Sequence, residues 1–545
     1  MNFMHNETAQ KLRGGYYTPL DLAAYVSRWV AKVKPKRILE PSCGDGVFLQ
    51  ALASVSLGKS DITALELDGI EAAKAVARSR DLRIAPTILD EDFLGWAIEN
   101  LHAGVARFDA VVGNPPFIRY QYLPAEFQWK AERVFAELNC KFTKHTNAWV
   151  PFVLASIALL RPGGRLGMVV PSELIHVLHA QSLRTFLAAE CRKVVLIDPE
   201  EIWFENTLQG AVLLLAEKKA DRSKPGEGLG LVPVRGRQFL KSDPEVVFAE
   251  AEALSGKTIE AKWTRAFLSH SVRDLLDEIQ ASDQVKPFST VAKVDVGIVT
   301  GANKFFLVND DTVERFGLQN WAHPMFGRSE HCPGVVYDEA QHQRNKKAGL
   351  PANFLWFPDS TALQDPKVAA YIKTGKAEEL HKRYKCRIRK NWYSVPSVSA
   401  SSVGMLKRCH DAPRLILNKI GAYTTDTAYR VEVADIRPSA FVSNFINPLT
   451  ALSAELEGRT YGGGVLELVP SEIERLLVPA ITSAAAPLKD LDKAIRAKSM
   501  SEVHQTHGLR VLQALGISAP LGRTLFEAWE KLKDRRQRAS TPDEE

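Results

Sequence analysis

The sequence predicts an α/β protein whose first domain is Rossmann-like, with a mostly parallel sheet, and whose second domain has mixed α+β structure. Three observations support this prediction. Short apolar runs alternate with helical segments from residue 37 to residue 215, which is typical of a parallel sheet covered by helices on both faces. A charged stretch containing Gly and Pro follows at 219–230, and the apolar pattern after it is less regular. The chain has 545 residues, which exceeds the usual length of one domain.

Apolar runs of strand length define the sheet of the first domain. They are 37–40, 62–66, 108–112, 164–170, 194–198 and 211–215. Ligands bind at the carboxyl ends of the strands in open α/β sheets, so the loops after these strands contain the candidate site. We expect the first domain to cover 1–222, a linker and connecting segment to cover 223–280, and the second domain, with a C-terminal helical tail, to cover 281–545.

The composition is that of an ordinary globular protein, with 45% hydrophobic and 25% charged residues. A formal net charge of +6 permits a nucleic-acid partner without requiring one. The 6 cysteines form no CxxC pair, so the sequence predicts neither a disulfide framework nor a metal site. No apolar stretch is long enough to cross a bilayer, and residues 1–13 lack the apolar core of a signal peptide, so we expect no membrane partner and a cytoplasmic location.

A glycine-containing turn follows the first predicted strand, at Glu40–Gly46. Gly44 and Gly46 allow the backbone to approach a ligand closely. Glu66 ends the next strand, about 20 residues later, where a carboxylate can accept hydrogen bonds from ribose hydroxyls. Because the turn does not read GxGxxG, a nucleoside without pyrophosphate fits it better than a dinucleotide.

A further element of the same kind is the acidic and aromatic pair Asp92-Phe93, which precedes the predicted strand at 108–112. The Asp92 carboxylate is a candidate acceptor for an adenine amine. The Phe93 ring is a candidate to lie on the adenine. A surface Asp before an aromatic residue is also common in ordinary loops, so this pair has meaning only together with the glycine turn and Glu66.

The most informative segment is Asn114–Phe117, directly after a predicted strand. Consecutive prolines at 115 and 116 fix φ and remove two N–H groups, which gives a stiff, extended loop whose carbonyls can accept hydrogen bonds. An exocyclic amine is a poor nucleophile because its lone pair is delocalised into the ring. Acceptors on its two hydrogens, the Asn114 side-chain oxygen and the Pro115 carbonyl, would favour sp3 character. Phe117 offers a face on which a base removed from its helix can stack.

Taken in order, these segments resemble the γ-class, Taq-type adenine-N6 DNA methyltransferases. Further matches at 15–19, 160–164 and 171–172 extend the resemblance over residues 14–217. It implies a class I S-adenosylmethionine-dependent methyltransferase fold for the first domain, and direct methyl transfer to N6 of a flipped-out adenine in DNA. It also implies that residues 17–19 pack around the methionine end of the cofactor, and that Phe204 lies on the far side of the flipped adenine.

The resemblance and the local chemistry together assign the candidate site. The predicted catalytic residues are Asn114, Pro115, Pro116 and Phe117. The predicted S-adenosylmethionine-binding residues are Tyr17, Thr18, Pro19, Glu40, Pro41, Ser42, Gly44, Gly46, Glu66, Asp92 and Phe93. Within this set the resemblance implies that Glu66 and Asp92 hold the ribose and the adenine of the cofactor. Cys43, beside Ser42, is a departure from the family pattern at a position where we expect it to be tolerated.

The second domain carries weaker matches to the target-recognition domains of the same family, at 296–306, 389–393, 424–427 and 461–464. They imply double-stranded DNA as the partner. We see no metal-dependent nuclease motif in the chain, so restriction activity would require a separate endonuclease.

The run 382–390 is basic, with an aromatic residue near either end. If it is extended, Lys385, Arg387 and Arg389 face one way and can follow a phosphate backbone. Together with Trp392 they are the predicted DNA contacts of the second domain. The alternative is a charged edge strand exposed to solvent.

Other functions remain open at this point. The Asn-Pro-Pro-aromatic chemistry also serves enzymes that methylate RNA adenines or protein glutamines, although these are usually compact and lack a large second domain. Cytosine-N4 enzymes more often have Ser where Asn114 stands. A non-catalytic DNA-specificity subunit with the same fold is the alternative from a different class.

Overall fold

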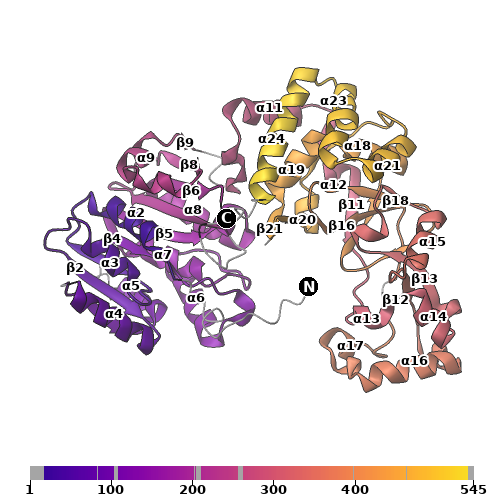
Figure 1. Ribbon diagram of the computed structural model, residues 1–545, viewed down its shortest axis with the longest axis horizontal. Coiled ribbons are helices and arrows are strands. Elements are labelled where there is room, and N and C mark those ends of the chain that lie inside the picture. The colour runs from indigo at the N-terminus through magenta and orange to yellow at the C-terminus, as the bar shows by residue number, and fades with distance from the viewer. Residues whose placement is uncertain are drawn as a thin grey trace, which may run out of the picture. The chain divides into compact units, whose positions relative to one another are not determined.

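The computed structural model describes residues 17–82, 84–103, 108–201, 203, 210–255, 262–396, 398–461 and 463–537. It divides into two compact units, the first ending at Phe267 and the second covering Leu268–Gln537. Each unit is an independent body with its own core, and each is described by itself below (Figure 1).

The first unit is built on a sheet with the strand order β3-β2-β1-β4-β5-β7-β6-β8-β9. Strands β1 to β5 pair in parallel, and β7 is antiparallel to both of its neighbours. The strands are β1 (Arg37–Glu40), β2 (Asp61–Glu66), β3 (Thr87–Asp90), β4 (Phe108–Gly113), β5 (Leu160–Pro171), β6 (Cys191–Pro199), β7 (Ala211–Lys218), β8 (Gly228–Val234) and β9 (Ala253–Leu254). This doubly wound order confirms the predicted Rossmann-like, class I methyltransferase fold.

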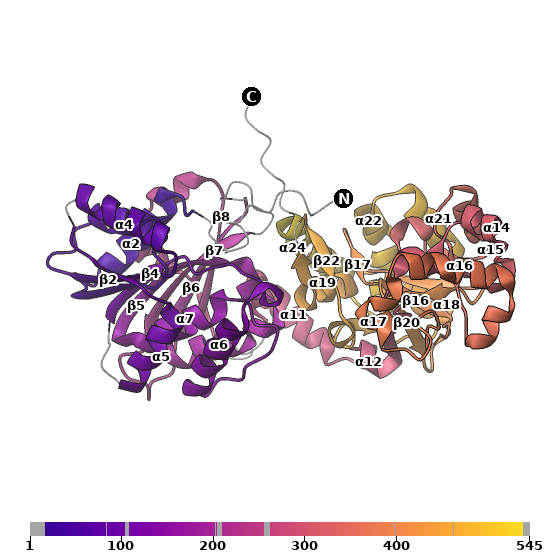
Figure 2. The same cartoon turned by 90° about the horizontal axis from the view of Figure 1, so that it is seen from below.

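Helices cover both faces of this sheet (Figure 2). On one face lie α2 (Leu20–Ala31), α3 (Val47–Ala53), α4 (Gly69–Asp81) and α9 (Pro244–Glu250). On the other face lie α5 (Phe93–Ala103), α6 (Ala125–Glu137), α7 (Trp149–Leu159) and α8 (Gln181–Glu190). No helix of the described residues is long and apolar enough to cross a membrane.

Helix α2 shows why the sequence packs in this way. Its buried residues include Leu22, Val26 and Trp29, which recur at the spacing of one helical face. The facing residue on β5 is Gly167, where an added Cβ would lie 2.7 Å from Val26 Cγ1. The glycine therefore lets α2 cross directly over the sheet, and the apolar stripe of the helix closes the core there.

The expected linker at 223–280 differs from the structure, because residues 228–234 form β8, which pairs in parallel with β6. The glycines that suggested a linker serve close packing instead. A Cβ at Gly230 would lie 2.9 Å from Ala251 Cβ. The boundary between the units therefore lies at Phe267, beyond the strands that extend the first sheet.

The second unit has the expected mixed α+β structure and several small sheets. Its five-stranded sheet contains β11 (Ala292–Val296), β20 (Ala428–Val433), β16 (Val403–Leu406), β18 (Leu415–Asn418) and β14 (Val336–Tyr337). A four-stranded sheet contains β12 (Leu307–Val308), β15 (Asn353–Leu355), β13 (Ala322–Phe326) and β19 (Tyr423–Thr424). The smaller sheets pair β10 (Val285–Pro287) with β23 (Leu477–Pro479), and β17 (Arg408–Cys409) with β22 (Val465–Glu467) and β21 (Arg459–Tyr461).

Helices surround these sheets. They are α11 (His270–Gln280), α12 (Phe288–Val291), α13 (Asn303–Phe306), α14 (Asp310–Phe316), α15 (Glu339–Lys347), α16 (Pro366–Ala377), α17 (Tyr384–Arg387), α18 (Pro438–Phe445), α19 (Pro448–Glu457), α20 (Pro470–Ile473), α21 (Leu488–Ala497), α22 (Met500–Val503), α23 (Leu509–Ala514) and α24 (Ala519–Gln537). The last helix is packed into the core, because Trp529 is fully buried and Arg536 forms a buried ion pair with Glu455 at 2.8 Å.

Candidate active site

The loops after β1, β2 and β4 meet at the carboxyl ends of these strands, where the sequence places the site. The Ser42 hydroxyl donates to the backbone oxygen of Asn114 at 3.1 Å. The backbone N–H of Gly44 donates to Glu66 Oε2 at 2.8 Å. The predicted cofactor loop and the predicted catalytic loop are therefore in direct contact. Glu66, at the end of the neighbouring strand, stabilises the cofactor loop through its hydrogen bond with Gly44.

The glycines of the first loop have the conformational role that the sequence indicates. Gly44 and Gly46 have φ of +54° and +87°, in the left-handed region that favours glycine. At Gly46 an added Cβ would lie 3.1 Å from Ala75 Cα on α4. At Gly44 no described atom lies within 4 Å of such a Cβ, so the backbone there borders open space. This is the arrangement that lets a ligand approach a backbone closely.

Glu40 ends β1 beneath this loop and is fully buried. Among the described residues, neither of its carboxylate oxygens has a hydrogen-bond partner. Burial, with added repulsion from Glu66 and Asp45, raises the pKa of Glu40 well above its usual range. A buried carboxyl group without a partner is costly, so this position fits a positively charged ligand group. The α-ammonium of S-adenosylmethionine is such a group, and the buried Glu40 carboxylate, as its acceptor, therefore fits the predicted cofactor.

Glu66 is largely occupied by the protein itself. Besides Gly44, its other oxygen accepts from the backbone N–H of Asp68 at 2.9 Å. Each carboxylate oxygen can accept more than one hydrogen bond, so ribose hydroxyls can still be bound there. The next residue, Leu67, is 70% exposed. Leu67 is not among the residues predicted from sequence to bind the cofactor, although an apolar residue directly after the strand-ending Glu66 is a usable signal for a surface that packs on a nucleoside.

Asp92 directly precedes α5 and Phe93 begins it, and the structure gives them different surroundings. Asp92 Oδ2 accepts from the backbone N–H of Gly95 at 2.8 Å and lies 3.2 Å from Lys130 Nζ on α6. The Phe93 ring is only 2% exposed and packs on Phe152, with the ring centroids 5.0 Å apart. Phe93 was predicted to lie on the adenine ring. Instead the first turn of α5 directs it into the core, where it supports the wall of the site.

The catalytic loop is held from the N-terminal side. Asn114 Nδ2 donates to the hydroxyl of Thr18 at 3.0 Å, and Thr18 is 6% exposed. This contact fixes the plane of the Asn114 amide, so that Nδ2 faces Thr18 and Oδ1 lies on the opposite side of the amide. The segment 17–19, which the resemblance placed near the methionine end of the cofactor, thus also orients the predicted catalytic side chain. Of its other members, Tyr17 is exposed and directed at Glu71, and Pro19 precedes α2.

The prolines and Phe117 complete the loop. Pro115 is buried, whereas Pro116 and Phe117 are half-buried. Pro41, from the cofactor loop, lies against the same segment, because a Cβ on Gly113 would be 3.3 Å from Pro41 Cδ. Phe204, the predicted aromatic on the far side of the base, lies outside the described residues.

Asn147, which sequence analysis missed, holds the chain just after Phe117. Its Oδ1 accepts from the backbone N–H of Tyr120 at 3.2 Å, and its Nδ2 donates to Glu173 Oε2 at 3.0 Å. Burial raises the pKa of Glu173, while Arg119 and the hydrogen bond from Asn147 act in the opposite direction. Asn147 therefore ties the catalytic loop to the carboxyl end of β5. Nothing in the local sequence indicates this role, because both partners are distant along the chain.

The predicted DNA contacts in the second unit are not on an edge strand. Residues 384–387 form α17, with Lys385 and Arg387 exposed to solvent. Arg389 Nη2 donates to the backbone oxygen of Val299 at 2.7 Å, so this guanidinium holds the fold. Trp392 is partly buried, and its ring centroid lies 5.2 Å from that of Phe305. The extended geometry expected for this run is therefore wrong, because the backbone N–H of Arg387 donates to the backbone oxygen of Arg383 at 2.8 Å, which closes a helical turn.

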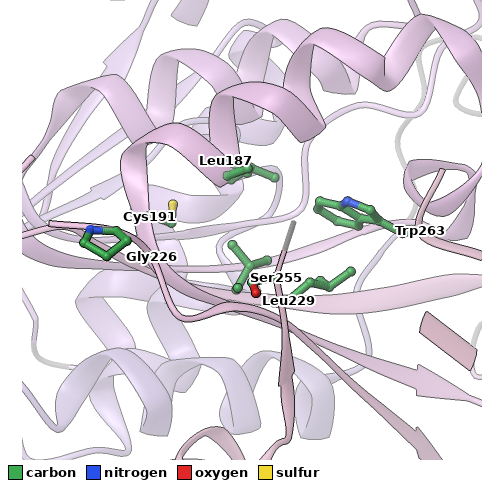
Figure 3. A pocket seen from close by; sticks show the side chains of 10 residues that line it. Leu187, Cys191, Gly226, Leu229, Ser255 and Trp263 are labelled. Carbon is green, nitrogen blue, oxygen red and sulfur yellow. The ribbon is translucent and has the colours of Figure 1, made fainter. Parts of the chain in front are cut away.

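A cavity of about 250 Å³ lies elsewhere in the first unit, at the amino ends of β6 and β8 (Figure 3). Leu187, Leu229 and Trp263 contribute apolar walls, and Cys191 lies at one side. Burial raises the pKa of the Cys191 thiol to about 12. The cavity is at the sheet edge opposite the glycine loop, so it is separate from the candidate active site. No three His, Cys, Asp or Glu side chains of the described residues are grouped so as to hold a metal ion.

The chain is similar to known families and proteins over most of its length. Residues 2–299 match the family described as N-6 DNA Methylase, and residues 260–512 match the family described as the C-terminal domain of the Type II methyltransferase M.Eco57I. The Type II methyltransferase M.AccI of Acinetobacter calcoaceticus is 23% identical over 84% of this chain and 84% of its own length. M.XamI of Xanthomonas campestris pv. amaranthicola is 21% identical over 87% of this chain and 86% of its own.

Solved structures give more distant similarities. The type IIG restriction endonuclease BpuSI is similar over 98% of this chain and 67% of its own, with 15% identity and a TM-score of 0.42. The complex of DrdV with DNA is similar over 78% of this chain and 50% of its own, with 11% identity and a TM-score of 0.47.

Proposed function

This chain belongs to the N-6 DNA Methylase family, whose match at residues 2–299 covers more than half of it, and we propose that it transfers the methyl group of S-adenosylmethionine to N6 of an adenine in double-stranded DNA. Its class is thus that of a DNA methyltransferase. The choice of adenine, the extrusion of that adenine from the duplex and the roles of single residues are parts of the proposal.

The observation that carries the proposal is the contact between Ser42 and Asn114. It brings the loop that fits a nucleoside cofactor against the loop that fits an exocyclic amine. A methyl donor and a methyl acceptor bound by these two loops would share one site, which is the requirement for direct transfer. Holding the two reactants in one geometry removes much of the entropic cost of their encounter.

The cofactor, when bound, supplies a methyl group activated by a sulfonium sulfur. In our proposal Glu40 accepts hydrogen bonds from its α-ammonium group. Glu66 accepts hydrogen bonds from its ribose hydroxyls, and Asp92 accepts one from its adenine amine. Leu67 packs on the nucleoside from the solvent side, because it is the exposed apolar side chain next to Glu66.

For the acceptor, Asn114 Oδ1 and the Pro115 carbonyl accept the two hydrogens of N6. These hydrogen bonds strengthen as N6 becomes tetrahedral, so they stabilise the transition state more than the ground state. A new N6–C bond then forms while the bond from carbon to sulfur breaks, and one N6 proton leaves to solvent. Thr18 orients the Asn114 amide for this role, and Phe117 stacks on the extruded adenine.

The experiment that tests the proposal offers several acceptors to the purified full chain. Duplex DNA, RNA and a glutamine-containing peptide are each incubated with radiolabelled S-adenosylmethionine, with Asn114→Ala as control. We expect label in duplex DNA alone, recovered as N6-methyl-2′-deoxyadenosine on digestion to nucleosides. Label in RNA, in the peptide or on cytosine N4 would overturn the assignment of substrate. Binding of cofactor and DNA without any transfer would support a non-catalytic specificity subunit instead.

Partners follow from the same proposal. The relatives are named Type II methyltransferases, which fits a role in a restriction-modification system with a separate restriction endonuclease as partner.

A further inference from the structure

The segment 382–390 of the second unit carries an apolar pair among unneutralised cations. Tyr384 is 64% exposed and Ile388 is 61% exposed, and they are the most exposed large apolar side chains among the described residues of this unit. They stand four residues apart on α17 and its C-cap, a spacing that puts both on one side of a helical turn. Single exposed apolar residues are ordinary, but a pair of them at helical spacing in such a short element is not.

Four of the cations around this pair form no ion pair within the described residues, whereas Lys382 pairs with Glu379. Arg383, Lys385, Arg387 and Lys390 are exposed, and no ion pair joins any of them to an acidic residue within the described ranges. Lys385 Nζ lies 5.6 Å from the centre of the Tyr384 ring, so the charge and the aromatic surface adjoin. An unneutralised cluster of this kind has the charge that a phosphate backbone complements.

The segment is held rigidly although nearly all of it is exposed. Cys386 is fully buried, and its thiol lies 3.9 Å from the backbone oxygen of Thr300. Arg389 ties the end of the segment to Val299, and a Cβ on Gly301 would lie only 2.8 Å from Lys385 Cβ. Figure 1 shows α17 next to α13, which follows this loop. The buried Cys386 and the loop 299–301 thus hold the segment in place, so that the apolar pair and the cations form one preorganised surface.

We propose that residues 382–390 form a DNA prong, in which Tyr384 and Ile388 contact bases while Arg383, Lys385, Arg387 and Lys390 contact phosphates. The partner is duplex DNA, because apolar or aromatic side chains among unpaired cations match a groove floor between two phosphate backbones. Arg389, by contrast, is committed to Val299 and does not contact DNA. The proposal rests on the proposed function only for the identity of the nucleic acid.

Two variants and two probes distinguish the contribution of phosphate contacts to DNA affinity from the contribution of base contacts. The charge variant replaces Arg383, Lys385, Arg387 and Lys390 with Gln, and the apolar variant is Tyr384→Ser with Ile388→Ser. The matched controls are Gln at Lys489, Lys493, Lys498 and Arg523, which are exposed in the same unit, and Leu363→Ser with Leu521→Ser. The probes are a mixed-sequence DNA duplex and heparin, which is polyanionic but has no bases. Affinity is measured against salt concentration by fluorescence anisotropy on the full chain.

The charge variant should weaken binding of both probes. It should make the slope of log affinity against log salt for the duplex less steep by about 0.9 for each phosphate that is no longer neutralised. The apolar variant should leave that slope and heparin binding unchanged, and weaken duplex binding by roughly fivefold to 140-fold, the range that one stacked base supplies. Tyr384→Phe with Ile388→Leu should restore duplex binding.

An unchanged slope in the charge variant would overturn the prong, as would equal effects of the apolar variant on duplex and heparin or no effect on either. Melting temperatures close to wild type verify that each variant folds, which is expected because the replaced side chains are exposed. Methylation by the wild-type chain is measured in parallel. If the wild type methylates DNA but the variants bind like wild type, the prong fails alone. If the variants behave as expected and no methylation occurs, the proposed function fails alone.

Discussion

Glu40 is the side chain whose charge state should change most when the methyl donor binds. It is fully buried, its oxygens have no hydrogen-bond partner among the described residues, and its pKa is raised well above the usual range, first by burial and then by Glu66 and Asp45. The unliganded protein should therefore hold a proton on Glu40 at mildly acidic pH. An ammonium group that arrives beside it favours the charged form, so binding should release that proton.

Release of one proton determines both the sign and the size of the pH dependence of cofactor affinity. Because the pKa is raised in the unliganded protein, lower pH favours the unliganded state. Affinity should therefore increase about tenfold, or about 1.4 kcal/mol, for each pH unit, and become constant above the raised pKa. By the same linkage, the free energy of unfolding of the unliganded wild type should fall as pH rises from the usual carboxyl pKa towards the raised one. Glu40→Gln has a similar shape and does not titrate, so it should lose both dependences and bind the ligand more weakly.

The assay is isothermal calorimetry with S-adenosylhomocysteine, which keeps the ammonium group and lacks the sulfonium charge. Titrations in two buffers of different ionisation enthalpy count the protons released on binding. Asp45→Asn is the matched control, because Asp45 belongs to the same loop but is already paired with Arg78 at 2.7 Å. Asp45 is the smallest of the three causes of the raised pKa of Glu40, so this control should keep most of the proton release. If Glu40→Gln binds with wild-type affinity and releases the same number of protons, Glu40 does not accept the ammonium and the reasoning is refuted.

The remaining predictions concern the catalytic loop and its supports. Asn114→Ala should lower kcat by on the order of 10² with little change in DNA affinity, because it removes a preorganised acceptor that acts in the transition state; equal single-turnover rates would refute the amine-activation mechanism. Phe117→Trp should keep substantial activity while Phe117→Ala loses it, and the loss should shrink on a duplex whose target adenine is mispaired, because that base costs less to extrude; an equal loss on both duplexes argues against stacking. Lys130→Met should weaken cofactor binding several-fold with kcat at saturation unchanged, because Lys130 lies 3.2 Å from Asp92 and helps to orient it; Lys130→Arg should rescue the affinity, and a pure kcat effect would place Lys130 elsewhere in the mechanism.

The parts of the site that sequence predicts are those encoded within a few residues of one another. The glycine loop and Asn114 stand directly after a strand and Glu66 ends one, and the topology of a parallel sheet brings such positions to one edge. In the structure these positions are in contact, as that topology predicts: Ser42 donates to the backbone oxygen of Asn114, and Gly44 donates to Glu66. The identity of the chemistry is likewise local, because Asn114 and the prolines form one short segment.

Contacts between distant segments were not predictable in this way. The hydrogen bond from Asn114 to Thr18 and those of Asn147 to Tyr120 and Glu173 join residues far apart in sequence. None of them leaves a periodic signal, because a single polar side chain in a loop has many alternative partners.

In the second unit, the sequence correctly predicts an exposed basic segment at 382–390 but wrongly predicts that it is extended. Cations at alternate positions of 382–390 fit the period of a strand, but Tyr384 and Ile388 also fit a helical turn, and the structure forms the turn, with the backbone oxygen of Arg383 accepting from Cys386 and Arg387. Similarly, Gly226 and Gly230 are compatible with a linker in the sequence alone, but in the structure both lie in close packing beside the paired strands β6 and β8. In the second case the deciding interaction is tertiary, and short segments do not contain it.

The central claim is that Asn114 activates an adenine amine in DNA for methylation. It is tested most directly by long-read sequencing of DNA from cells that express the full chain, compared with cells that express Asn114→Ala. The account predicts N6-methyladenine at one recurring sequence with the wild type and its absence with the variant. Unmodified adenines with the wild type, methylation on cytosine, or equal adenine methylation with Asn114→Ala would contradict it.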